Sequence, residues 1–215
     1  MTASVRQVGT MYSRIRNTDV FAATNASLFV FMCIAVYYNR YTKHHIVANV
    51  YEFLFYAVVI LAAIAVGWRY LRTVAFPSWV LILMQVGILA HFAGGFVPVE
   101  GGRLYDISVA GLPFDKYVHA LNAFAGGALV SCLLERQKAH PRLYWVFVLL
   151  IVQGCGAIVE IVEYVAKLNV PQTGVGDYDN NMQDLVANFV GVAMFLTAAA
   201  LTRAGTRLAA RRSPA

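Results

Sequence analysis

Six long apolar stretches are the feature that most limits what this chain can fold into. Each holds close to the roughly 20 residues that an α-helix needs to cross a bilayer core. They run over about Ala22–Tyr38, Ile46–Trp68, Pro77–Val97, Tyr117–Leu134, Tyr144–Ala166 and Leu185–Leu201. Only 13% of the 215 residues are charged, about half the usual share in a soluble domain. The sequence therefore predicts an all-α fold, a polytopic membrane bundle of six transmembrane helices.

The basic residues predict how the bundle is oriented. An even number of spans puts both termini on one side, and most of the 17 Lys and Arg residues lie on that side. The smaller set, on the opposite side, is Arg40, Lys43, Arg103, Lys116 and Lys167. The positive-inside rule then places both termini in the cytoplasm. This gives a basic cytoplasmic segment over residues 1–21, a six-helix transmembrane domain over 22–201 and a basic cytoplasmic tail over 202–215.

Two long connectors, Pro98–Phe114 and Lys167–Asp184, then face outward. They are rich in Gly, Pro and Asp and carry little helical signal. The N-terminal stretch is polar and runs into the first apolar run without an A-x-A-like site, so no cleavable signal peptide is expected. We expect a multi-pass protein of the bacterial inner membrane, with its polar site facing the periplasm or exterior. Because the positive charges are spread over loops and tails, membrane lipids are the expected partners and nucleic acid is not.

Small residues recur inside the last four spans. They are Gly94-Gly95, Gly126-Gly127, Gly154 with Gly156, and Ala187 with Gly191. Small residues let helix backbones approach closely in lipid, so these spans should form one tight bundle. Cys33, Cys132 and Cys155 lie in three separate apolar runs, without the close pairs of a zinc or haem-attachment motif.

Acidic side chains inside the fifth span are the strongest indication of a site. Glu160 and Glu163 are three residues apart and share a helical face, with Gln153 two turns back. A charge inside a bilayer costs roughly 2.5–3.5 kcal/mol on insertion scales, so such residues usually mark function. Two carboxylates on one face indicate a bound cation or proton; pairing with a Lys, or protonation, is the structural alternative.

The fourth span adds Asp115 and His119, four residues apart, with Asn122 one turn further. An Asp/His pair at this spacing can bind one metal ion or orient an imidazole, while Asp115 could also cap its helix. His91, in the third span, is expected at a matching depth. A hydrogen bond to a neighbouring helix is its alternative role.

The segment before the sixth span is the most polar one outside the termini. D-x-D spacing without the later Gly and Glu does not fit a calcium loop. Asp177 and Asp179 are expected in a loop that folds back as a lid above the site, with a solvated loop as the structural alternative. Asp184 opens the sixth span, as a ligand or as a helix cap, and Asn188 follows one turn later as a supporting residue.

The order of these motifs resembles a known pattern. Asp115-Lys-Tyr-Val-His119, Glu160-Ile-Val-Glu163 and Asp184-Leu-Val-Ala-Asn188-Phe-Val-Gly191 are similar to the D-K-x-x-H, E-x-x-[EQ] and D-x-x-x-N-x-x-G motifs of VanZ-like proteins. The closer likeness is to the YjdF-like bacterial inner-membrane family, which also has an acidic loop before the last span. The resemblance covers about Ala90–Val192 and implies a place in the cell envelope without a defined chemistry.

Three functions follow as hypotheses. The first is a metal-dependent enzyme on an envelope lipid, with His91, His119, Glu160, Glu163 and Asp184 as ligands and Asp115 or Glu163 as catalytic base. Mixed imidazole and carboxylate donors suit zinc, manganese or iron. The second is a proton- or cation-coupled transporter. The third is a non-catalytic subunit associated with other membrane subunits; a haem between His91 and His119 belongs here, although nearby carboxylates suit a macrocycle poorly.

Overall fold

The computed structural model describes residues 15–37, 47–100, 102–138, 140–169 and 177–212. The chain divides into two compact units, Met1–Ala75 and Phe76–Ala215. The predicted polar residues all lie in the second unit.

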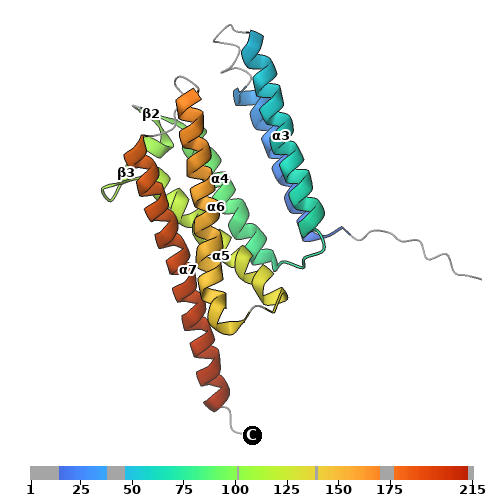
Figure 1. Ribbon diagram of the computed structural model, residues 1–215, viewed down its shortest axis with the longest axis vertical. Helices are drawn as coiled ribbons and strands as arrows, with labels where there is room; N and C mark the ends of the chain where they lie inside the picture. The colour runs from blue at the N-terminus through green and yellow to red at the C-terminus, as the bar shows by residue number, and fades with distance from the viewer. Residues whose placement is uncertain (1–14, 38–46, 101, 139, 170–176, 213–215) are drawn as a thin grey trace, which may run out of the picture. The chain divides into compact units, whose positions relative to one another are not determined.

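The first unit contains two helices that lie side by side (Figure 1). Helix α1 covers Asn17–Met32 and continues into one π-helical segment, and α3 covers Val47–Leu71. The two helices are joined by Asp19, whose carboxylate accepts hydrogen bonds from Trp68 Nε1 and Arg72 Nε, both at 2.8 Å. The start of α1 is therefore held against the end of α3 by an ion pair between them.

The second unit is built from four helices. They are α4 (Ser78–Phe96), α5 (Phe114–Arg136), α6 (Pro141–Asn169) and α7 (Tyr178–Arg212). Helix α5 contacts each of the other three, and α7 also packs along α6 (Figure 1). Their shared core is apolar and comprises Val80, Ala123, Ala128, Tyr144, Val148, Val152, Val192 and Phe195. A continuous apolar core of this kind holds the polar ends of the helices in register.

Glycine lets two of these helices approach closely. A Cβ added at Gly191 of α7 would lie 2.0 Å from the backbone oxygen of Ala120 on α5, so only glycine fits there. Gly154 behaves differently, since a Cβ there would meet no described atom within 4 Å. The prediction that small residues pack the bundle thus holds at Gly191 but is wrong at Gly154, because that position faces away from the neighbouring helices.

The connector between α4 and α5 has regular structure that the sequence did not predict. Strands β1 (Pro98–Val99) and β2 (Gly102–Arg103) form one hairpin, and β3 (Ser108–Val109) and β4 (Leu112–Pro113) form another. The second turn has positive φ at Ala110 (51°) and Gly111 (86°), as tight hairpin turns require. A 3₁₀ turn, η2 (Leu104–Asp106), joins the hairpins. The end of the unit where they lie is called the hairpin end below.

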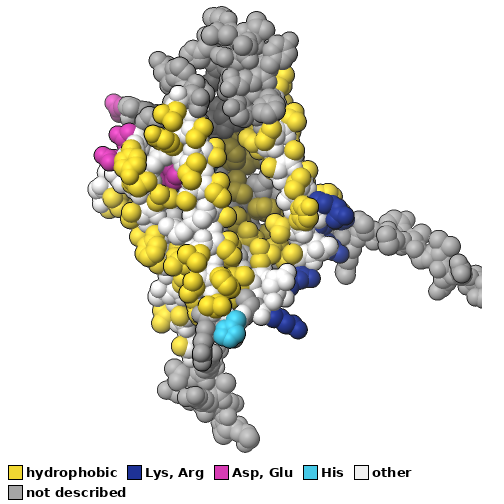
Figure 2. All heavy atoms as spheres, in the orientation of Figure 1, with side chains coloured by type: hydrophobic (Ala, Val, Ile, Leu, Met, Phe, Trp, Pro, Cys, Tyr) yellow, Lys and Arg dark blue, Asp and Glu magenta, His cyan; other side chains and the backbone are white. Residues whose placement is uncertain are grey.

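The predicted all-α helix bundle is confirmed in its main features. Among the described residues, five helices are long and apolar enough to cross a membrane, and α3 contributes a shorter apolar stretch, Ala57–Leu71. Hydrophobic side chains cover most of the helix surface in view, whereas the acidic side chains in view gather at the hairpin end (Figure 2). This distribution is typical of helices whose flanks face lipid.

The last helix starts earlier than predicted. Helix α7 begins at Tyr178 rather than near Leu185, because Asp177 accepts a hydrogen bond from the Asn180 backbone N–H at 2.9 Å and caps the helix. Asp179 consequently lies in the first helical turn, and Asp184 lies well inside α7 and does not cap it. Residues 170–176 of the connector before α7 lie outside the described residues, whereas the predicted lid residues Asp177 and Asp179 lie at the start of α7.

Candidate functional site

Helices α5, α6 and α7 bring together three of the predicted ligands at the hairpin end. One donor atom from each of His119, Glu160 and Asp184 lies within 4.8 Å of the other two. The His119 imidazole lies between the carboxylates, with Nδ1 at 3.7 Å from Glu160 Oε1 and Nε2 at 3.5 Å from Asp184 Oδ1. Both separations are too long for hydrogen bonds. The three side chains are neighbours that do not bind one another directly.

Glu160 has an unusual environment for a carboxylate. Its side chain is 4% exposed, and neither oxygen has a hydrogen-bond partner among the described residues. Helix α7 holds the backbone nearby, because Asn181 Nδ2 donates to the Glu160 carbonyl oxygen at 3.2 Å. A buried carboxylate without partners is costly unless a cation or proton neutralises it. The carboxylate oxygens are therefore the part of the site that is open to a ligand.

Asp115 and Asp184 both form ion pairs with Lys116. Lys116 Nζ lies 3.0 Å from Asp115 Oδ2 and 2.7 Å from Asp184 Oδ1. Asn180 supports the same pair by donating from Nδ2 to Asp184 Oδ2 at 2.8 Å. The suggestion that Asp115 caps α5 is wrong, since Pro113 occupies the cap position. Asp115 instead forms an ion pair, and its Oδ1 is buried without a hydrogen-bond partner among the described residues.

His91 contacts Tyr105 and is not part of the cluster of three residues. Its Nδ1 lies 2.6 Å from the Tyr105 hydroxyl, and the two rings make an edge contact with centroids 5.7 Å apart. Tyr105 packs against Gly94, where a Cβ would lie 2.1 Å from the tyrosine ring. Burial raises the pKa of Tyr105 above its ordinary range, so the hydroxyl keeps its proton and can donate it to His91. His91 is not one of the three clustered residues, and its hydrogen-bond partner is Tyr105 in the hairpin connector.

Three more predicted residues, Glu163, Asn188 and Asn122, lie about one helical turn from members of the cluster. Glu163 is half-buried one turn after Glu160, outside the group of three. Asn188 is buried, with its Nδ2 2.8 Å from where a Cβ of Gly156 would lie. Asn122 is half-buried and packs against Gly87 in the same manner. These amides lie one helical turn from Asp184 and His119, as expected for supporting positions.

Sequence reasoning missed Lys116, Asn180 and Tyr105. Lys116 enters the sequence predictions as an outer-side charge and as the Lys of the D-K-x-x-H motif but has no role in the predicted site, although it precedes His119 by three residues and shares its helical face. Asn180 precedes Asp184 by four residues, which places the two side chains together once α7 is known to begin at Tyr178. The sequence around Tyr105 does not predict its contact with His91, because the fold of the hairpin connector brings the two residues together.

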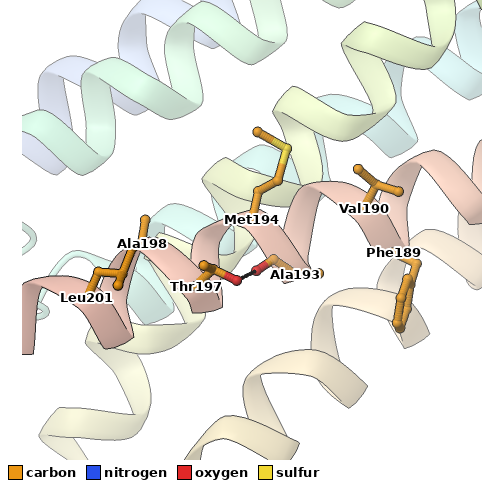
Figure 3. Close-up of a pocket in the computed structure, with 7 residues that line it drawn as sticks. All are labelled: Phe189, Val190, Ala193, Met194, Thr197, Ala198 and Leu201. Carbon is orange, nitrogen blue, oxygen red and sulfur yellow. Dashed lines mark hydrogen bonds between the residues drawn. The ribbon is translucent and has the colours of Figure 1, made fainter. Parts of the chain in front are cut away.

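A separate hollow of about 440 Å³ lies along α7 alone (Figure 3). Its lining is almost entirely apolar and consists of Phe189, Val190, Ala193, Met194, Thr197, Ala198 and Leu201. The Thr197 hydroxyl donates to the Ala193 carbonyl oxygen at 2.8 Å within the helix. The hollow thus offers little polar chemistry and is typical of a lipid-facing helix surface.

Comparison with known proteins supports a membrane assignment. No curated protein and no solved structure matches the chain. A family model described as "Predicted membrane protein (DUF2238)" matches residues 4–205, nearly the whole chain. The YjdF-like likeness is consistent with this match; the VanZ-like motif order has no support from it. Together with the apolar helices, the match shows that this chain belongs to the DUF2238 family of multi-pass membrane proteins.

Proposed function

We propose that this protein is a metal-dependent membrane enzyme that acts on a lipid of the cell envelope. His119, Glu160 and Asp184 hold one divalent ion, zinc, manganese or iron. In this proposal the chain crosses the bacterial inner membrane six times with both termini in the cytoplasm. The hairpin end then faces the periplasm or exterior, and the site lies in the outer half of the bilayer.

The observation that carries the proposal is the buried, unpartnered carboxylate of Glu160 beside His119 and Asp184. Lys116 supplies one positive charge to a layer that holds Asp115, Glu160 and Asp184. The layer therefore keeps a surplus of negative charge, which a divalent cation would balance. The two close approaches use different ring nitrogens, His119 Nδ1 at 3.7 Å from Glu160 Oε1 and Nε2 at 3.5 Å from Asp184 Oδ1. The imidazole would therefore have to turn so that one nitrogen meets an ion that both carboxylates bind, with ligand atoms about 2.1 Å from the ion.

The position of the site favours a lipid substrate. All three ligands project from membrane-spanning helices near the ends of those spans, where lipid headgroups meet the hydrocarbon. A bound ion there would acidify a water molecule or polarise a phosphoryl or carbonyl oxygen of a headgroup. Glu163, half-buried one turn from Glu160, is suited to act as general base. Asp115 is less suited to that role, because one of its oxygens is committed to Lys116.

Metal analysis of the detergent-purified protein tests the proposal. The wild type should carry about one transition-metal ion per chain, and Glu160→Gln and His119→Ala should each lose most of it, because each removes a ligand. Glu135→Gln is the matched control, since Glu135 pairs with Arg203 at 2.6 Å at the opposite end of α5. A wild type that stays metal-free after purification with each candidate ion would refute the metal site.

The transporter and subunit hypotheses predict other results. A carrier should catalyse proton or cation flux in proteoliposomes that Glu163→Gln abolishes. The apolar core of the second unit, from Val80 to Phe195, offers no obvious path for such flux. A non-catalytic subunit should co-purify with a defined partner and turn over no lipid.

A further inference from the structure

Lys116 lies inside a cage of oxygen atoms. Its Nζ is 2.7 Å from Asp184 Oδ1, 2.8 Å from Asn180 Oδ1, 3.0 Å from Asp115 Oδ2 and 3.3 Å from the Asn180 backbone oxygen. The side chain is 6% exposed. A lysine at a lipid-facing or water-facing position would not be surrounded in this way, so the cage is a built binding site for a cation.

The ammonium group has no donor left for a substrate. Lysine carries three N–H donors, and the three shortest contacts, to Asp184, Asn180 and Asp115, account for all of them. Lys116 is therefore not suited to clamp a headgroup or to transfer a proton. Lys116 can therefore affect the site only through Asp115, Asn180 and Asp184, the residues that it binds.

The oxygen atoms of the cage are of the kinds that hard metal cations prefer as ligands. Two carboxylates, an amide oxygen and a backbone carbonyl are the usual ligands of calcium. The His119–Glu160–Asp184 group differs from this set because it contains an imidazole, which favours transition metals. Two neighbouring cation sites of different chemistry thus meet at one residue, Asp184.

Asp184 Oδ1 is the shared atom. It lies 2.7 Å from Lys116 Nζ and 3.5 Å from His119 Nε2, and Asp184 is 1% exposed. We propose that Lys116 is a built-in cation which takes the place of a second metal ion, with Asp184 as the carboxylate between it and the His119 site. The part of this inference that concerns the His119 site rests on the proposed function. The cage itself, formed between α5 and α7, does not depend on it.

Replacing the lysine should convert the cage into a calcium site. In chelator-treated protein, Lys116→Ala should lower the unfolding temperature by roughly 5–15 °C, because it leaves two buried carboxylates without their cation. Millimolar Ca²⁺ should then recover at least half of this loss in the variant and change the wild type little. Metal analysis should find one Ca²⁺ per chain in the variant beyond any transition metal.

Two further variants separate the explanations. Lys116→Met keeps the bulk of the side chain without its charge, so it should be destabilised and should not respond to Ca²⁺. A Lys116→Met protein as stable as the wild type would show that the lysine only fills space and would overturn the inference. So would a Lys116→Ala protein that does not respond to Ca²⁺. If Lys116→Ala is too unstable to purify without calcium, purification in about 5 mM CaCl₂ should restore its yield, because weak calcium sites have dissociation constants on the order of 0.1–1 mM. Failure there counts against the cage.

The double variant His119→Ala/Lys116→Ala distinguishes this inference from the proposed function. Histidine is not part of the cage, so its calcium response should equal that of Lys116→Ala. If the wild type binds no transition metal but the calcium response appears, the proposed function fails and the cage stands. If the wild type binds its metal and the calcium response is absent, the reverse holds.

Discussion

Glu160 shows at the level of one residue how a membrane site stores unfavourable free energy. Its two oxygens are buried without hydrogen-bond partners in the described part of the chain, and the imidazole of His119 is 3.7 Å away. In a soluble domain such a carboxylate would be hydrated. Here the side chain is 4% exposed, so its charge is costly to bury unless a cation or a proton neutralises it.

Because the buried carboxylate is costly, Glu160→Gln should change the free energy of unfolding in opposite directions with and without metal. In chelator, the variant should be more stable than the wild type by about 1–3 kcal/mol, because an uncharged amide is cheaper to bury than an unpaired carboxylate. With saturating metal the order should reverse, since the variant has lost a ligand. Thermal unfolding in both conditions measures this, with Glu135→Gln as the control whose small effect should not depend on metal. A variant that is less stable in both conditions would contradict the prediction.

At the level of elements, the distance between α5 and α7 determines the site. Lys116 and His119 on α5 meet Asn180 and Asp184 on α7 only because the two backbones come close at Gly191 and Ala120. The glycine lies seven residues from Asp184, about two helical turns, so a wider separation of the helices there would also separate Lys116 from Asp184.

Gly191→Ala should therefore lower stability by about 1–3 kcal/mol, because the new Cβ would meet the Ala120 backbone, which cannot rotate out of the way. Gly154→Ala is the matched control, since no described atom lies within 4 Å of its added Cβ. It should be neutral or stabilising by up to about 1 kcal/mol through helix propensity. Unfolding of the two variants in the same detergent compares them, and equal losses would argue against close α5–α7 packing.

At the level of the whole molecule, the proposed function requires that the hairpin end face out. The proposed orientation places the β3–β4 hairpin outside the cell and the C-terminus inside. In a variant lacking Cys33, Cys132 and Cys155, a cysteine at the exposed Ser108 should react with a membrane-impermeant maleimide in intact spheroplasts. A cysteine appended after Ala215 should react only after permeabilisation. Labelling in the opposite order would invert the topology and place the site on the cytoplasmic side.

Local signals in the sequence were enough to predict most helices and the three residues that cluster at the hairpin end. His119, Glu160 and Asp184 are conspicuous because they are polar residues in or beside apolar runs, and counting residues from the span ends predicts that they lie at similar depth. The start of α7 was misplaced by about seven residues, since the polar segment Tyr178–Asp184 resembles a loop in composition although Asp177 caps it as a helix. Predicted depth in the membrane also placed His91 with His119, but in the structure His91 pairs with Tyr105 and lies outside the cluster.

The amino-acid sequence by itself determined that the chain forms apolar helices and that acids and histidines gather near one end of them. Hydrophobic length and helical period are properties of a few adjacent residues, so they can be read from local sequence. Only the tertiary structure decided which polar groups are partners: Lys116 with Asp115, Asn180 and Asp184, His91 with Tyr105, and Glu160 with none described. Those pairings depend on how closely helices approach and how they are rotated, and residues far apart in the chain set both.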